Sequence, residues 1–103
     1  MDIDEKTLVI LIKATAAVEY GVSIVDIEST ARRAKNISSA RRLAQYLTRE
    51  NTTFSYPEIG ALFSADQSSV RYAVRRMRKD IYKNTALLKR CVEINTVLNS
   101  MKG

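Results

Sequence analysis

Two amphipathic segments separated by a short polar interruption constrain the fold of this chain more than any other feature. The first segment opens with Ser-Tyr-Pro-Glu, a spacing in which Ser55 accepts from the amide of Glu58 and the Glu58 carboxylate bonds back to Ser55. Pro57 suits the first turn of a helix, where no amide hydrogen is needed. We therefore expect a short helix here, in which Gly60 lets another backbone approach. Its apolar face would consist of Ile59, Leu62 and Phe63.

The interruption holds two candidate caps for a second helix, either Ser64, with Gln67 three residues on, or Asp66. After it, apolar residues recur at spacings of three and four, which predicts an amphipathic helix. Two helices joined by a short turn form a helix-turn-helix, here over residues 55–82, although a plain helical hairpin would show the same pattern. The apolar stripe comprises Val70, Ala73, Val74, Met77 and Ile81.

In a helix-turn-helix, the N-terminal residues of the second helix enter the major groove of DNA. At the N-terminal end of the second segment, five residues carry side chains that can form hydrogen bonds. These residues are Asp66, Gln67, Ser68, Ser69 and Arg71. They are therefore the first candidates for contacts with bases.

The distribution of charge indicates a polyanionic partner. The 103 residues hold 17 Lys and Arg against 11 Asp and Glu, a formal net charge of +6. Residues 1–30 hold six of the acids and two of the bases, so the rest of the chain carries fifteen bases and five acids, a net of +10. Between Ala31 and Arg49 there are six bases and no acid. A solvated surface usually mixes both signs, so this one-sided charge favours contact with phosphates.

The chain offers little for catalysis or metal binding. Histidine is absent, which removes the usual general base and the commonest metal ligand. Cys91, the single cysteine, has apolar neighbours at helical spacing, which favours a buried thiol over a nucleophile. We therefore expect no enzyme, no cofactor and no metal site. The longest apolar run, residues 8–12, is too short to cross a membrane and no signal peptide precedes it, so we expect a cytoplasmic protein.

Hydrophobic periodicity predicts two helices at the start of the chain. The first, over residues 4–20, would end at Gly21, and the second, over residues 24–28, would be capped by Ser23. A strand over residues 8–12 would have no partner strand. The buried face of the first helix is predicted to contain Leu8, Leu11, Ile12, Thr15, Ala16 and Val18.

Residues 29–36 are polar, lack hydrophobic periodicity and carry three cations, so we interpret them as a basic loop. Asn36 or Ser38 would cap the helix that follows. The buried stripe of that helix is predicted to be Ile37, Ala40, Leu43, Ala44 and Leu47. Four polar residues fall outside the stripe, namely Arg41, Arg42, Gln45 and Arg49.

The end of the chain is predicted to add one packing helix. The chain would turn over residues 79–84, and Thr85 would cap a helix over residues 85–101. Its apolar residues have heptad-like spacing, but two heptads are short for a coiled coil, so packing within the domain is favoured. They are Leu87, Cys91, Ile94, Leu98 and Met101. The fold class predicted for residues 1–103 is all-α, a compact bundle of about six helices in one domain.

Several of these motifs occur in the order of a known domain. The most specific are residues 57–60, Pro-Glu-Ile-Gly, and residues 66–70, Asp-Gln-Ser-Ser-Val. Residues 18–27, the arginine pair of the basic loop and residues 40–47 precede them. Over nearly its full length, the chain resembles the C-terminal DNA-binding domain of DnaA, the bacterial chromosomal replication initiator. The resemblance implies a Trp-repressor-like helix-turn-helix that reads a short, asymmetric, A·T-rich box.

The resemblance also implies roles for particular residues. An arginine of the basic loop enters the minor groove in the family, and Arg33 matches its position, with Arg32 and Lys35 beside it. The helix after the loop presents polar and basic residues to the duplex, which correspond to Arg41 and Arg42. The signature that contacts bases and phosphates corresponds to Asp66, Gln67, Ser68 and Ser69.

This chain departs from the family at the signature itself. The usual histidine is Gln67, the threonines are Ser68 and Ser69, and the Gly-rich turn is shortened to Ser64-Ala65. A glutamine amide suits adenine, whereas serine lacks the methyl group that could contact thymine, so the box is expected to differ. The initiators also carry an ATPase domain, but these 103 residues contain no Gly-rich phosphate loop. We therefore expect a stand-alone domain.

The leading hypothesis is sequence-specific binding of double-stranded DNA by a bacterial or phage-encoded, nucleoid-associated regulator of replication or transcription, without ATPase activity. Readout is assigned to Arg33, Gln67, Ser68 and Ser69, beside Asp66. Phosphate contacts are assigned to Arg32, Lys35, Arg41, Arg42, Arg71, Arg75 and Arg78, of which the last three share one stripe.

The alternative hypothesis is an interaction module that binds an acidic partner or modulates a replication initiator or another replication or transcription protein. The oligomeric state is expected to be a monomer, as in the family, or a homodimer. No membrane contact is expected.

Overall fold

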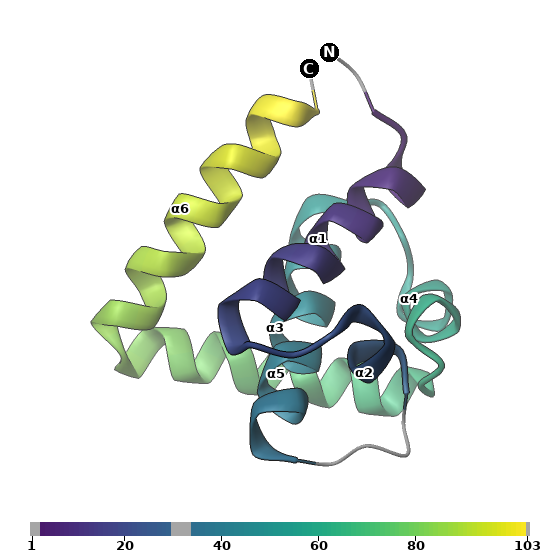
Figure 1. Ribbon diagram of the computed structural model, residues 1–103, viewed down its shortest axis with the longest axis horizontal. Coiled ribbons are helices and arrows are strands. Elements are labelled where there is room, and N and C mark those ends of the chain that lie inside the picture. Colours follow the sequence, from purple (N-terminus) through teal and green to yellow (C-terminus); the bar gives the residue numbers. More distant parts are fainter. Residues whose placement is uncertain (1–2, 30–33, 103) are drawn as a thin grey trace.

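The computed structural model describes residues 3–29 and 34–102, and in these the secondary structure is entirely helical. The helices of this part are α1 (Glu5–Tyr20), α2 (Ile24–Glu28), α3 (Lys35–Asn51), α4 (Tyr56–Phe63), α5 (Gln67–Lys83) and α6 (Thr85–Met101) (Figure 1). The all-α prediction of about six helices is confirmed. Arg32 and Arg33 lie outside the described residues. None of the helices in the described part combines the length and the apolar character that spanning a bilayer requires.

Local capping signals set most of the helix ends. The Asp4 side chain accepts from the Thr7 amide at 2.7 Å, and Gly21 ends α1 in the left-handed conformation, with a φ of 66°. Ser23 and Ser55 each form the reciprocal capping box, the latter with Glu58 as the spacing predicts. The ends at Gly21, Ser23 and Ser55 confirm the sequence-based predictions, because both partners of each cap lie close together in the chain. Asp4 was predicted to be the first residue of α1 and is instead its cap.

Three predicted helix ends are wrong. Helix α3 begins at Lys35 after Ala34, which has no side-chain cap, so neither Asn36 nor Ser38 caps it and the loop is shorter than predicted. The Asn36 side chain instead accepts from the next amide along the chain, at 3.1 Å. Helix α5 continues to Lys83, so the chain does not turn over residues 79–84.

The cap of α6 also differs from the prediction by one residue. Asn84, and not Thr85, precedes the helix, and its side chain accepts from the Leu87 amide at 3.1 Å. Asn84 is a strong capping residue, and Ile81 is half-buried against the core, so the apolar stripe of α5 extends close to the end of that helix.

Helix α3 forms the centre of the core and packs against α1 and α5 (Figure 1). All five residues of its predicted stripe are buried. Two residues were placed wrongly by periodicity. Val18 was expected inside but is 82% exposed, because α1 turns Val9 and Ala17 inward instead, and Gln45 was expected outside the stripe but is 3% exposed.

Lys13 is a buried cation that joins three helices. Its side chain extends from α1, and its ammonium group donates to Glu28 Oε2 at 2.7 Å and to the carbonyl of Leu62 at 2.6 Å. It also lies 4.7 Å from the centroid of the Phe63 ring. A buried charge is tolerated only when it is paired and hydrogen-bonded, and both conditions hold here. The contact connects α1 to the ends of α2 and α4.

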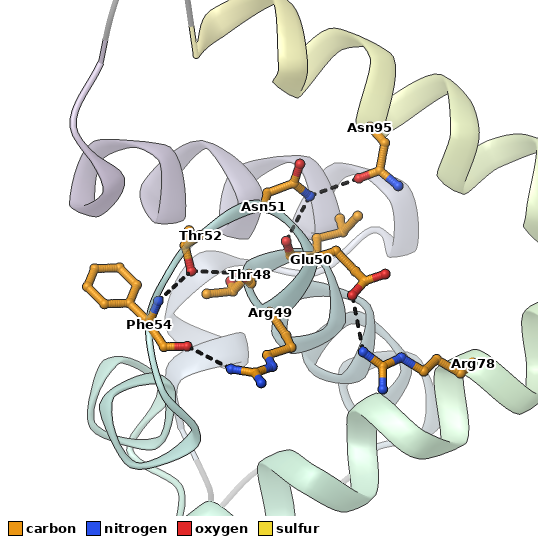
Figure 2. A network of polar contacts seen from close by, with 9 residues as sticks. Thr48, Arg49, Glu50, Asn51, Thr52, Phe54, Arg78 and Asn95 are labelled. Carbon is orange, nitrogen blue, oxygen red and sulfur yellow. Dashed lines mark hydrogen bonds and ion pairs between the residues drawn. The ribbon is translucent and has the colours of Figure 1, made fainter.

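Polar contacts also hold α6 against the other helices. Asn51 donates through Nδ2 to the Leu47 carbonyl and to Asn95 Oδ1, each at 2.8 Å (Figure 2). Nearer the start of α6, Arg90 donates to both carboxylate oxygens of Glu19, at 2.5 and 2.7 Å. Cys91 is buried between these contacts, and burial raises the pKa of its thiol, with a smaller effect from the charge of Glu19.

Gly60 provides a test of the close approach between α4 and the turn after it. A Cβ at this position would lie 2.4 Å from the Ala65 carbonyl oxygen, a backbone atom that cannot move aside. We expect Gly60→Ala to lower the free energy of unfolding by about 3 kcal/mol despite the better helix propensity of alanine. Thermal or urea unfolding measures this loss.

Gly21→Ala is the matched control. Gly21 has nothing within 4 Å of the added Cβ, so only the cost of its left-handed backbone applies, about 1 kcal/mol. Equal losses in the two variants would contradict the close approach at Gly60.

Candidate nucleic-acid interface

The turn between α4 and α5 has the geometry of a helix-turn-helix. Ser64 ends α4 in the left-handed conformation, with φ 55° and ψ 41°, and the Ala65 amide donates to the Gly60 carbonyl at 2.9 Å. Of the two candidate caps, Asp66 is the one used, accepting from the Ser69 amide at 3.0 Å. In Figure 1 α4 is seen nearly end-on and α5 from the side, so the two helices cross steeply.

An open groove of about 540 Å³ lies beside this turn. One wall is the first half of α3, and the other is the turn with the start of α5. The groove therefore brings the α3 arginines next to the start of the predicted recognition helix, although the two regions are more than twenty residues apart in the chain. The lining residues are Ser38, Arg41, Arg42, Gln45, Ser64, Ala65, Asp66, Ser69, Tyr72 and Ala73.

The predicted reading residues stand exposed at the edge of this groove. Asp66, Gln67, Ser68 and Ser69 all occupy the first turn of α5 or its cap, but only Asp66 and Ser69 line the groove. Gln67 accepts through Oε1 from Arg71 at 3.4 Å. Ser69 also donates through its hydroxyl to Asp66 at 3.4 Å. The carboxylate of Asp66 is therefore occupied by the cap.

An aromatic ring orients Arg71. Its guanidinium lies 4.7 Å from the centroid of the Tyr56 ring, and that of Arg49 lies 4.4 Å from the same centroid. Arg49 also donates to the Phe54 carbonyl at 3.1 Å (Figure 2). Such cation–π contacts restrict a long side chain, so Arg71 and Gln67 present a partly ordered pair on the exposed face of α5.

The predicted arginine stripe of α5 is not uniform. Arg78 pairs with Glu50 of α3 at 3.2 Å (Figure 2), whereas Arg75 is exposed and has no carboxylate partner among the described residues. Arg75 instead lines a second groove of about 470 Å³, which runs along α5 with Tyr72, Arg76, Lys79, Asp80 and Lys83.

Arg41 and Arg42 differ although they are neighbours. Arg41 is half-buried, and its guanidinium donates to the carbonyls of Ile27 and Asp26, each at 3.0 Å, and also to that of Ser29. Arg42 lines the groove without a carboxylate partner in the described part of the chain. Lys35, the first residue of α3, is exposed.

The acidic side chains of the described residues are engaged in structural contacts, and several cations have no carboxylate partner in the same part of the chain. Hydrogen bonds from Ser55 lower the pKa of Glu58, and those from Thr7 lower the pKa of Asp4, so both carboxylates stay ionised within their caps. The remaining engaged acids are Glu5, Glu19, Asp26, Glu28, Glu50, Asp66, Asp80 and Glu93. Cations without a carboxylate partner among residues 3–29 and 34–102 include Lys35, Arg42, Arg75 and Lys79.

Six residues that line the groove are not among the site residues predicted from the sequence, namely Ser38, Gln45, Ser64, Ala65, Tyr72 and Ala73. Tyr72 could have been found, because it lies three residues after Ser69 and so shares its helix face. The periodicity of α3 placed Gln45 outside the buried stripe, whereas the residue is 3% exposed and lines the groove together with Tyr72 and Ala73 of α5.

The steep crossing of α4 and α5, the tight turn and the basic groove define a helix-turn-helix DNA-binding domain. Residues 9–77 match the family described as "Bacterial dnaA protein helix-turn-helix". The chain belongs to this family, and the resemblance stated from its motifs is confirmed.

Chromosomal replication initiator proteins DnaA are among the relatives. That of Pelobacter propionicus is 41% identical over 68 residues, which is 65% of this chain and 15% of the relative. That of a Picosynechococcus species is 36% identical over 85 residues, covering 82% and 19%. That of Streptococcus pyogenes is 36% identical over 92 residues, covering 88% and 20%. The chain thus spans at most a fifth of the length of these three relatives.

Two substitutions at Asp66 test its role as the α5 cap. Asp66→Ala removes the acceptor for the Ser69 amide and should lower the free energy of unfolding by about 1 kcal/mol. Asp66→Asn keeps an acceptor oxygen of similar capping strength and should unfold nearly as the wild type does. Urea unfolding of both variants decides, and an asparagine variant as unstable as the alanine variant would contradict the assignment.

Proposed function

We propose that this chain binds double-stranded DNA at particular sequences, using the start of α5 in the major groove and the basic residues around the start of α3 on the adjacent backbone and minor groove. One observation carries the proposal. Arg42, which has no carboxylate partner among the described residues, lines the groove of about 540 Å³ beside the exposed first turn of α5. Phosphates supply the missing negative charge, and base edges supply partners for the exposed polar side chains.

Within this proposal, different residues provide affinity and selectivity. Lys35, Arg42, Arg71 and Arg75 neutralise phosphates together with Arg32, while Arg33 enters the minor groove as the resemblance implies. Gln67, Ser68 and Ser69 face the bases. A glutamine amide can donate to adenine N7 and accept from its N6, so the preferred site should contain adenine where Gln67 reaches it.

We further propose that the chain regulates replication or transcription by occupying its sites, alone or in competition with an initiator. The support is its relation to the initiators, together with a basic DNA-binding surface contained within 103 residues. Occupancy of an asymmetric site suits a monomer. Selection of bound sequences from random duplexes would identify the site, and footprinting beside an initiator would show whether the two compete.

A second candidate function is an interaction module that uses α6. Leu88, Val92 and Val97 are 44%, 55% and 53% exposed, more than expected for apolar residues of a helix that serves packing alone. A partner retained after nuclease treatment, together with no preference among duplexes, would favour this function over DNA binding.

Salt dependence tests whether phosphates provide the affinity. Binding releases counterions, so a plot of log K against log salt should fall with a slope of about −0.9 for each phosphate neutralised. Five phosphate contacts would therefore give a slope of about −4 to −5. Fluorescence anisotropy of a labelled duplex between 50 and 200 mM salt measures it, and a flat plot would exclude the proposal.

Gln67→Ala tests base readout. We expect the variant to lose about 1–3 kcal/mol of binding free energy on the selected duplex and little on a scrambled duplex, because only the selected site offers the matching base. Lys89→Ala is the control, since Lys89 is exposed on α6 away from the groove and should leave both affinities unchanged. Equal losses of Gln67→Ala on both duplexes would make Gln67 a backbone contact.

A further inference from the structure

Arg41 is half-buried, and its guanidinium is bound to backbone carbonyls of the protein itself. Its Nε donates to the carbonyl of Ile27, and its Nη2 donates to those of Asp26 and Ser29. These carbonyls belong to the last turn of α2 and to Ser29, the residue after it, and the Asp26 carbonyl also accepts from the Ser29 amide at 3.3 Å. The C-terminal end of a helix carries partial negative charge, which favours a cation there. A planar guanidinium with donors in a fixed fork suits such a cluster of carbonyls.

The hydrogen bond from Arg41 to Ser29 links the start of the basic loop to the helix that follows the loop. Ser29 is the first residue of the predicted loop, whereas Arg41 belongs to α3, the helix that follows it. The hydrogen bond between them therefore spans twelve residues and fastens the start of the loop to the helix at its end.

A second cation, Lys13, contacts the same end of α2, and it precedes α2 in the sequence whereas Arg41 follows it. Glu28, the last residue of α2, accepts from Lys13, which also donates to the Leu62 carbonyl in the last turn of α4. The end of α2 is thus connected to α3 through Arg41, and to the helix-turn-helix through Lys13. Both contacts lie in the described part of the chain, and their acceptors at the end of α2 precede Arg33, the predicted minor-groove residue, by only a few positions.

Resting on the proposed function, we propose that Arg41 is a positioning residue that sets where the basic loop begins relative to the helix-turn-helix, whereas Arg42 contacts phosphate. This differs from the role that the resemblance implies for Arg41. If Arg41 sets the position of the loop, its loss weakens binding to a duplex whose sequence both the loop and α5 must contact. The loss of Arg41 does not change the number of phosphates neutralised.

The two roles separate in matched variants of the neighbouring arginines. Lysine keeps the charge but loses the fork, so Arg41→Lys should weaken binding to the selected duplex about tenfold, while Arg42→Lys should stay within about twofold. Glutamine removes the charge, so Arg42→Gln should reduce the salt slope by about 0.9, while Arg41→Gln should leave it unchanged. The scrambled duplex should bind Arg41→Lys nearly as well as the wild type.

A readout without DNA separates this proposal from the proposed function. In the free protein, hydrogen exchange of the amides of residues 27–29 should be faster in Arg41→Lys than in the wild type and unchanged in Arg42→Lys. A wild-type chain that does not distinguish the selected from the scrambled duplex would refute the proposed function, whatever the exchange of the variants shows.

Three results would overturn the positioning role. They are equal effects of Arg41→Lys and Arg42→Lys on the selected duplex, a salt slope reduced by about 0.9 in Arg41→Gln, and unchanged exchange in Arg41→Lys. Thermal unfolding of each variant shows that it is folded at the assay temperature. Should Arg41→Gln be unfolded there, Arg41→Lys alone decides, because its binding and exchange measurements do not depend on the glutamine variant.

Discussion

The ammonium group of Lys13 lies where α1 meets the ends of α2 and α4, and the arrangement of the binding surface depends on it. Burying a charge is costly, and Lys13 is only 5% exposed, so the contact persists because Glu28 and the Leu62 carbonyl both accept from it. These partners precede the basic loop and the helix-turn-helix turn. A single buried cation therefore holds two elements that must reach one duplex together.

The other charged residues of the described part include carboxylates that are paired within the fold and cations that are not. Carboxylates cap helices or pair across them, as Glu58 and Glu19 do, so their negative charge is used within the fold. Cations around the groove, such as Arg42 and Arg75, have no such partner among the described residues. The fold thus leaves cations unneutralised in two grooves of a chain whose net charge is +6, and such positive charge is what a phosphate backbone recognises.

Prediction from sequence succeeded where the partners are close in the chain. The box of Ser55 with Glu58, the glycine end of α1 and the stripe of α3 each follow from spacings of at most a few residues. It failed where a distant residue decides. The start of α3 has no side-chain cap. Arg41, which the sequence grouped with Arg42, instead donates to a carbonyl of α2, and no local pattern in the sequence reveals this contact.

The sequence by itself determined that this chain is helical, that its charge is one-sided and that it belongs to the DnaA helix-turn-helix family, because these depend on periodicity, composition and contiguous motifs. Only the tertiary structure decided which polar side chains remain on the surface. Lys13 is buried, Arg78 is paired with Glu50, and Gln45 lies beneath the groove, since each is set by the helix that packs over it. Periodicity predicts on which face of a helix a residue lies, but not which residues of other helices it contacts.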